Sequence, residues 1–226
     1  MLATRNAGKL AEFGRLLAPA GWELAGLDQT AGGASVTWEE DGPDYPSNAA
    51  IKARAVAGAL GALALGDDSG IEVPSLGGWP GLRSARWLGP AADDADRLRG
   101  LLRRLAPLAA EDRRAVFVCA LALAAPDRRG GAVLLARVEA RAEGLVLAER
   151  RGAGGFGYDP VFVPSGERRT TAEMGAAEKD RVSHRGRAVG LLLAALAASV
   201  APVPGGDRRR APGPEPGDPP AGQVGG

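Results

Sequence analysis

Two neighbouring aspartates are the first candidates for metal and proton chemistry in this sequence. Asp67 and Asp68 lie between two apolar stretches in LGDDSGIEV, residues 65–73. Adjacent side chains of an extended chain point to opposite sides, so one carboxylate can enter a site while the other holds a turn. A carboxylate is a hard oxygen ligand for Mg²⁺ and can accept a proton from water. The alternative interpretation is an Asp-rich turn without chemistry.

A second acidic segment precedes a predicted helix. It reads WEEDG at residues 38–42, and Glu40 can supply a further oxygen to a metal. Taken alone, such a segment is more typical of a solvated loop, so its interpretation depends on the other motifs.

The N-terminal segment TRNAGK, residues 4–9, combines a strand end, a Gly-containing turn and a helix start. Backbone N–H groups and the positive end of a helix gather at such a turn, and Lys9 adds a point charge. The segment is therefore a candidate phosphate-binding loop, although its spacing is not that of a Walker motif. An ordinary helix start with an exposed lysine is the alternative.

Glycines and aromatic residues are crowded together in GAGGFGYDP, residues 152–160. Glycine lets the backbone approach a ligand closely, an aromatic ring such as that of Phe156 can stack on a base, and Asp159 can accept hydrogen bonds from a base edge or ribose. A tight turn that packs Phe156 and Tyr158 before a strand is the alternative.

The segment EKDRVSHRGRA, residues 178–188, contains Lys179, the single histidine His184, and Arg185. His184 and Arg185 stand together at a predicted helix start. No Ser-His-Asp order, zinc-ligand spacing or dinucleotide fingerprint accompanies them, so nucleophilic and zinc chemistry are unsupported.

Composition excludes several classes of protein. The 226 residues carry a formal net charge of +1, which gives no general attraction for nucleic acid or anionic membrane. The single cysteine, Cys119, rules out an intramolecular disulfide and reads as a small buried hydrophobe. Neither a signal core nor a membrane-spanning run of about 20 apolar residues is found. We therefore expect a protein without nucleic-acid or membrane partners, located in the cytoplasm.

The elements that must position these residues follow from apolar spacing. We expect a strand end at residues 1–4, a helix from about Gly8, and a helix over residues 47–60 capped by Ser47. A third helix should follow Asp93, and its amphipathic pattern suggests a structural role. A final helix over residues 186–198 is apolar nearly all round, which predicts burial against the sheet or a second subunit.

Two apolar runs predict a hairpin. Residues 116–124 form a nearly continuous apolar strand, and residues 133–143 alternate between apolar and charged side chains after a Gly-rich turn. Strands and helices together predict an α/β fold with a mixed central sheet flanked by helices. Residues 201–226 are more than half Pro and Gly and are expected to form a disordered tail.

Taken together, these motifs resemble those of the inosine triphosphate pyrophosphatase family, the non-canonical purine NTP pyrophosphatases. The resemblance rests on TRNAGK, on EDG followed by NAxxKA, and on GDDSG, GWPGLRSARW, GGFGYDPVF and EKDRVSHRGRA, in family order from residue 1 to about residue 198. One departure is Ser47, where the family usually has Glu before Asn-Ala.

The resemblance implies a role for each matched residue. It implies Mg²⁺ as cofactor with Glu40 and Asp68 as ligands, Asp68 as proton acceptor, and Ser69 in contact with substrate. It also implies that the nucleotide is bound by the remaining motif residues, namely Thr4, Arg5, Asn6, Ala7, Gly8, Lys9, Phe156, Gly157, Tyr158, Asp159, Lys179, His184 and Arg185.

The implied activity is hydrolysis of dITP, ITP and XTP to the monophosphate and pyrophosphate, by a domain over residues 1–200 with a substrate cleft between two lobes. A homodimer is also expected. Two alternatives stay open: a pyrophosphatase for other modified nucleotides, and a protein that binds the triphosphate without hydrolysing it.

Overall fold

A computed structural model describes residues 1–200, and the predicted tail over residues 201–226 lies outside the described residues. The central feature is a five-stranded sheet in the order β2-β1-β3-β4-β5. Its strands are β1 (Ala64–Val73), β2 (Trp79–Pro80), β3 (Arg114–Pro126), β4 (Ala132–Val146) and β5 (Phe162–Pro164). These strands pair antiparallel, whereas Leu2 makes isolated parallel bridges to Gly26 and Leu65. The α/β fold is confirmed, and its mixed character is limited to those bridges.

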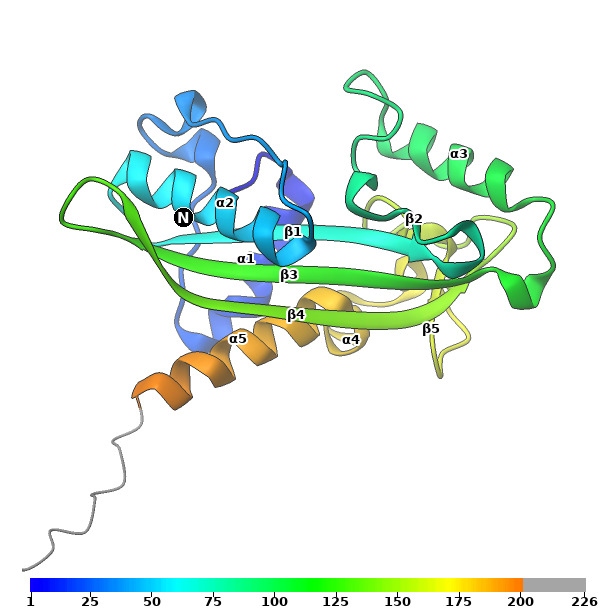
Figure 1. Cartoon of the computed structure of the whole chain (residues 1–226). Helices are drawn as coiled ribbons and strands as arrows, with labels where there is room; N and C mark the ends of the chain where they lie inside the picture. The colour runs from blue at the N-terminus through cyan, green and yellow to red at the C-terminus, as the bar shows by residue number, and fades with distance from the viewer. Residues whose placement is uncertain (201–226) are drawn as a thin grey trace, which may run out of the picture.

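Within residues 1–200, five α-helices surround the sheet (Figure 1). They are α1 (Ala7–Leu17), α2 (Tyr45–Leu60), α3 (Asp94–Leu105), α4 (Ala176–Val182) and α5 (His184–Val200). Short 3-10 helices cover Ala18–Ala20, Leu27–Gln29, Gly33–Ser35, Pro74–Leu76, Gly81–Arg83, Ala110–Asp112, Asp159–Val161 and Thr171–Glu173. No helix within residues 1–200 is both long enough and apolar enough to span a bilayer.

The long hairpin of β3 and β4 forms as the sequence predicts, and each strand is longer than expected at both ends. Continuous burial along β3 reflects helices on both of its faces. Ala120 and Ala122 pack with α2 on one face, while Cys119 and Leu121 pack with α1 and α5 on the other. Cys119 is fully buried, as its apolar surroundings predict.

The far end of the sheet carries the second lobe (Figure 1). The capping box of Asp93 and Asp96 starts α3, and the leucines of this helix pack on Ile71 and Phe117. Tyr158, from the segment before β5, and Phe162, the first residue of β5, complete this cluster. The predicted two lobes are therefore the α1, α2 and α5 side and the α3 side, joined by the continuous sheet.

Two local predictions need correction. The helix α2 begins at Tyr45 and is capped by Asp44, whose Oδ1 accepts from the Ser47 N–H at 2.7 Å, so Ser47 is not the cap. The two aspartates of GDDSG lie inside the continuous strand β1 and form no turn. Helix α5 packs on β3 and β4, as predicted, and does so with one face, because Leu192 is fully buried while Leu191 is 48% exposed.

Close contact between α2 and β1 depends on a glycine. A Cβ built on Gly66 would lie 2.0 Å from the Ala49 carbonyl oxygen, whereas one built on Gly14 in α1 would meet nothing within 4 Å. We therefore expect Gly66→Ala to lower the free energy of unfolding by roughly 3 kcal/mol, because α2 must move off the strand.

Gly14→Ala is the matched control for this substitution, and it should raise the unfolding free energy by about 0.5–1 kcal/mol through helix propensity. Urea denaturation measures both changes. Equal unfolding free energies for the two variants would contradict the close-packing argument.

Candidate active site

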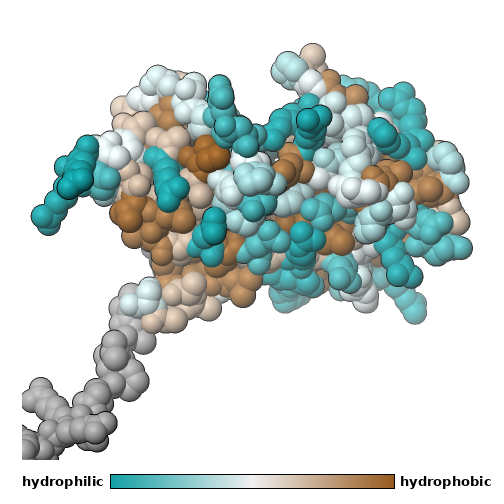
Figure 2. Space-filling view, viewed as in Figure 1, coloured by the Kyte–Doolittle hydropathy of each residue, from teal (hydrophilic) through white to brown (hydrophobic). Residues whose placement is uncertain are grey.

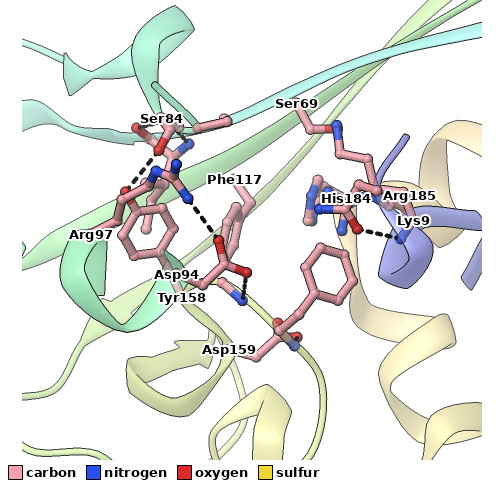
Figure 3. Close-up of a pocket in the computed structure, with 16 residues that line it drawn as sticks. Lys9, Ser69, Ser84, Asp94, Arg97, Phe117, Tyr158, Asp159, His184 and Arg185 are labelled. Carbon is pink, nitrogen blue, oxygen red and sulfur yellow. Dashed lines mark hydrogen bonds and ion pairs between the residues drawn. The ribbon is translucent and has the colours of Figure 1, made fainter. Parts of the chain in front are cut away.

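A cavity opens between the two lobes, and both lobes contribute to its wall (Figure 3). Among the residues that the sequence predicts for the site, those in the wall are Asn6, Lys9, Ser69, Phe156, Gly157, Tyr158, Asp159, His184 and Arg185. They come from segments that are up to 179 residues apart in the chain, and the fold brings them to one place.

The start of α1 forms one end of this cavity. Asn6 caps the helix, because its Oδ1 accepts from the Lys9 N–H at 3.0 Å. No acidic side chain lies in the first turn, so the positive helix end is not neutralised from within the helix. A Cβ on Gly8 would lie 2.8 Å from the Phe156 ring, so glycine allows the loop and the ring to approach closely. This end is suited to an anion.

Asp67 turns toward α1. Its carboxylate forms an ion pair with Lys9 and accepts from Ser69 Oγ at 2.5 Å and from Cys119 Sγ at 3.4 Å. Burial alone would raise the pKa of Asp67, but the cations of Lys9 and Arg185 outweigh burial and hold this pKa well below its usual range. Asp67 is thus an ionised group that fixes Lys9 and Ser69.

Asp68 turns toward α2, as the alternation along β1 predicts. Its Oδ1 accepts from Lys52 Nζ at 2.7 Å and its Oδ2 from Asn48 Nδ2 at 3.3 Å. Burial raises the pKa of Asp68, and the ammonium of Lys52 only partly opposes that rise. Asp68 is outside the cavity wall and on the opposite face of β1 from Asp67.

Glu40 meets Asp68 at a shared cation. Lys52 Nζ lies 2.7 Å from Glu40 Oε1 and 2.7 Å from Asp68 Oδ1. Arg86 forms an ion pair with Glu40 from the other side, so two basic residues hold this carboxylate. Ser47, the third residue of α2, makes no side-chain contact with Glu40 among the hydrogen bonds of residues 1–200.

Both faces of β1 are reached from one edge of the strand. Leu65 is bonded on this edge to Met1 and Ala3, and Ile71 N–H donates to Ser84 Oγ at 2.9 Å. Between these points no strand of the described chain pairs with the edge, and Lys52 Nζ donates to the Asp67 carbonyl at 3.0 Å. A ligand that lies across this edge can meet Lys9 on one face and Asp68 on the other.

The glycine-rich loop is ordered by Asp159. This carboxylate accepts from the Phe156 N–H at 2.8 Å, from Lys179 Nζ at 2.7 Å and from Thr171 Oγ1 at 2.8 Å. Gly155 and Gly157 flank Phe156 with φ of 71° and 61°, a conformation that favours glycine. Asp159 therefore holds the Phe156 ring in place through the backbone.

His184 and Arg185 begin α5 and are both buried. The His184 ring stacks on Phe117 at 4.6 Å with 5° between the planes, and Arg185 lies over the Phe156 ring at 5.0 Å. Burial, with the nearby Arg185 cation, lowers the pKa of His184 well below its usual range. Glu12 of α1 anchors Arg185, because its Oε2 accepts from Arg185 Nη1 at 2.9 Å.

Several predicted residues lie outside the cavity wall, which does not include Glu40, Asp68 or the residues Thr4, Arg5, Ala7, Gly8 and Lys179. Arg5 extends the other way and donates to the carbonyls of Ala34 and Val36 at 3.3 and 2.7 Å. Lys179 lies behind the Phe156 ring and pairs with Asp159 and Glu12.

No site role follows from the sequence for several wall residues, which include Ser84, Asp94, Arg97 and Phe117. In the sequence, Asp94 is typical of an ordinary helix start and Arg97 of an exposed helix face. Phe117 is one residue of an apolar strand. Tyr158 O–H donates to the Ser84 carbonyl at 3.0 Å and accepts from Trp87 Nε1 at 3.2 Å, so it ties the loop to the GWPGLRSARW segment. That motif was the one available signal.

Comparisons with known sequences point to a single protein family. Residues 1–195 match the model of the Ham1 family. A dITP/XTP pyrophosphatase of Symbiobacterium thermophilum is 47% identical over 198 residues, which are 88% of this chain and 94% of the relative. The dITP/XTP pyrophosphatase of Thermus thermophilus is 47% identical over 195 residues, 86% of this chain and 90% of the relative.

Solved structures agree with this match. A HAM1 protein from Coxiella burnetii superposes with a TM-score of 0.72 at 37% identity, covering 87% of this chain and 97% of the other. A nucleoside-triphosphatase, dITP/XTP pyrophosphatase, from Mycobacterium abscessus superposes with a TM-score of 0.62 at 43% identity, covering 85% and 97%. The resemblance seen in the motifs is confirmed, and the chain belongs to the Ham1 family.

Proposed function

We propose that this protein hydrolyses non-canonical purine nucleoside triphosphates, namely dITP, ITP and XTP, to the monophosphate and pyrophosphate, and so cleanses the nucleotide pool. One observation carries the proposal, namely that three features lie along the unpaired edge of β1. They are the aromatic cavity, the start of α1 with Lys9, and the carboxylates of Glu40 and Asp68, which converge on Lys52. The names of the relatives, which this chain matches over nearly their whole length, support the same reaction.

The base would occupy the aromatic part of the cavity. Phe156 offers a ring face, and the His184–Phe117 stack provides a second flat surface close to it. His184 and Arg185 would then meet the edge of the base that carries the 6-keto group, because both reach this part of the wall. A donor aimed at that oxygen would favour hypoxanthine and xanthine over adenine.

The phosphates would lie at the start of α1. Lys9 and the backbone N–H groups of the Thr4–Lys9 loop provide positive charge at that end. Ser69 stands beside Lys9 on the same face of β1, where its hydroxyl can contact the phosphate nearest the sugar.

Glu40 and Asp68 fit a magnesium site. Their oxygens already converge on one cation, the ammonium of Lys52, and Mg²⁺ commonly binds to one or two carboxylates together with substrate phosphates. Within residues 1–200 no group of three or more His, Cys, Asp or Glu residues is clustered as a metal site. When bound, Mg²⁺ supplies neutralisation of the charge on the triphosphate oxygens.

The chain's own residues account for the remaining steps. Lys9 and the loop amides orient the triphosphate, and Asp68 accepts the proton of the water that attacks the α-phosphorus. The bond between the α-phosphorus and the oxygen that bridges it to the β-phosphorus breaks as the new P–O bond to the water oxygen forms, and pyrophosphate leaves. No covalent intermediate with the protein is required.

A substrate panel tests this function. The full chain is incubated with dITP, XTP, dATP, dGTP and dTTP, with Mg²⁺ or with EDTA, and pyrophosphate is measured separately from orthophosphate. We expect pyrophosphate from dITP and XTP at least tenfold faster than from the other three, and none with EDTA.

Other outcomes of the panel would replace the proposal. A modified pyrimidine and a methylated nucleotide are added to the panel for this purpose, and release from one of these alone would indicate a different pyrophosphatase. Tight nucleotide binding without release would indicate a binding protein.

We also propose a homodimer in the cytoplasm without nucleic-acid partners. Apolar area is visible where β4 and α5 lie (Figure 2), and the exposed side chains there include Val133, Leu135 and Leu191. Such an area favours contact with another protein surface. The formal net charge of +1 gives no support to nucleic-acid binding.

A further inference from the structure

The cavity has a second polar side that faces α5 from across the aromatic rings. Asp94 is the first residue of α3 and Arg97 lies one turn later, and both line the same cavity as Phe156 and His184 (Figure 3). The two sides belong to different lobes. A flat ring held by the aromatic residues would therefore have polar groups from α5 on one side and from α3 on the other.

The α3 pair is held rigidly. Asp94 Oδ1 accepts from Arg97 Nη1 at 3.1 Å, and Asp94 Oδ2 accepts from the Gly157 N–H at 3.1 Å, next to Phe156. Arg97 Nη2 donates to the Ala92 carbonyl at 2.6 Å, and the Arg97 side chain is only 14% exposed. Its Nε is buried and has no hydrogen-bond partner within residues 1–200.

Arg97 consequently has donors to spare although most of its side chain is shielded from solvent. A guanidinium carries five N–H donors, of which two are engaged here. A buried donor without a partner is costly, so a ligand that supplies an acceptor at this place would gain from it. A guanidinium has no acceptor, so it cannot bond to an amino group.

We propose that Arg97 selects the substituent at C2 of the purine, favouring the 2-keto group of xanthine and disfavouring the 2-amino group of guanine. This inference rests on the proposed function. The C6 and C2 substituents of a purine point to different sides of the ring. With C6 toward His184 and Arg185, the C2 position faces α3.

Asp94 strengthens the same preference indirectly. A carboxylate is the natural acceptor for the amino group of guanine, but each oxygen of Asp94 already accepts one hydrogen bond, from Arg97 and from Gly157, which leaves fewer acceptor sites for that group. Arg97 therefore offers a donor to a keto group and also takes one of the acceptor sites that an amino group would use. Its removal should act in opposite directions on the two bases.

The test uses three substrates that differ only at C2: ITP with hydrogen, XTP with a keto group and GTP with an amino group. The kcat/KM for pyrophosphate release is measured for the parent protein and for Arg97→Met, which keeps an unbranched side chain but has no donor. We expect the XTP to ITP ratio to fall about tenfold and the GTP to ITP ratio to rise. Unchanged ratios, within twofold, would overturn the proposal.

Controls separate this selection from general damage. ITP lacks a C2 substituent, so a loss of folding or catalysis lowers all three rates together and leaves the ratios unaltered. Arg99→Met makes the same change on the solvent side of α3, where Arg99 is 60% exposed, and should leave both ratios at the parent values.

Arg97→Gln provides a second test if the methionine variant does not fold. An amide both donates and accepts, so we expect discrimination between XTP and GTP to shrink, and undiminished discrimination would overturn the proposal. If the parent releases no pyrophosphate from any of the three, the proposed hydrolysis fails. The same ratios are then measured as dissociation constants, which test Arg97 separately.

Discussion

Asp68→Asn is expected to lower kcat for pyrophosphate release from dITP by about 1000-fold or more. The substitution removes the proton acceptor and one of the two proposed metal ligands, and general-base catalysis alone contributes roughly 10²–10⁴-fold. Asparagine has nearly the same shape, and its amide oxygen can still accept from Lys52, which now donates to Asp68 Oδ1 at 2.7 Å. The loss should therefore lie in kcat far more than in KM.

Asp41→Asn is the matched control for this prediction. Asp41 is exposed and lies next to Glu40, so the same chemical change is made near the site without touching β1. We expect parent activity from it. Denaturation curves should show both variants folded, and more than a tenth of parent activity in folded Asp68→Asn would remove Asp68 from the mechanism.

Lys9→Met is expected to affect both catalysis and stability. Loss of one cation at the phosphates should lower kcat/KM by about 10²–10³-fold. The same change leaves Asp67 as a buried carboxylate without its ion-pair partner, since the Asp67 side chain is 0% exposed. Breaking a buried pair in this way costs about 3–5 kcal/mol of unfolding free energy.

A double substitution separates the two effects. In Lys9→Met with Asp67→Asn, no unpaired carboxylate remains, and the asparagine can keep its hydrogen bond with Ser69. We expect most of the lost unfolding free energy to return while kcat/KM stays low. Recovery of activity together with stability would show that Lys9 acts only by holding the fold.

The local structure around the aspartates could be predicted in part from the sequence. Alternation along β1 correctly indicated that Asp67 and Asp68 face opposite ways, since strand geometry is a local property. The alternation could not tell which helix each carboxylate meets. Lys9 lies 58 residues before Asp67, so their pairing is fixed only when α1 packs on the sheet.

Helix starts could also be predicted from neighbouring residues, whereas contacts between distant parts of the chain could not. The predicted helix start after Asp93 is confirmed, and the structure shows that the capping box of Asp93 and Asp96 specifies it. The sequence predicts that α2 starts at Ser47, whereas the helix begins at Tyr45, because Pro46 is tolerated in the first turn and Asp44 supplies the cap. The position of Asp94 and Arg97 in a cavity wall has no local signature, because it depends on how the two lobes meet.

His184 is the single histidine of the chain, and its ring is buried against Phe117 with a pKa well below the usual range. A solvent-exposed histidine would become charged as the medium acidifies toward pH 6. His184 stays neutral over that interval, so the wall beside the base keeps one charge state. The ratio of kcat/KM values for two bases should consequently stay constant as the pH falls toward 6, even where the overall rate changes with pH.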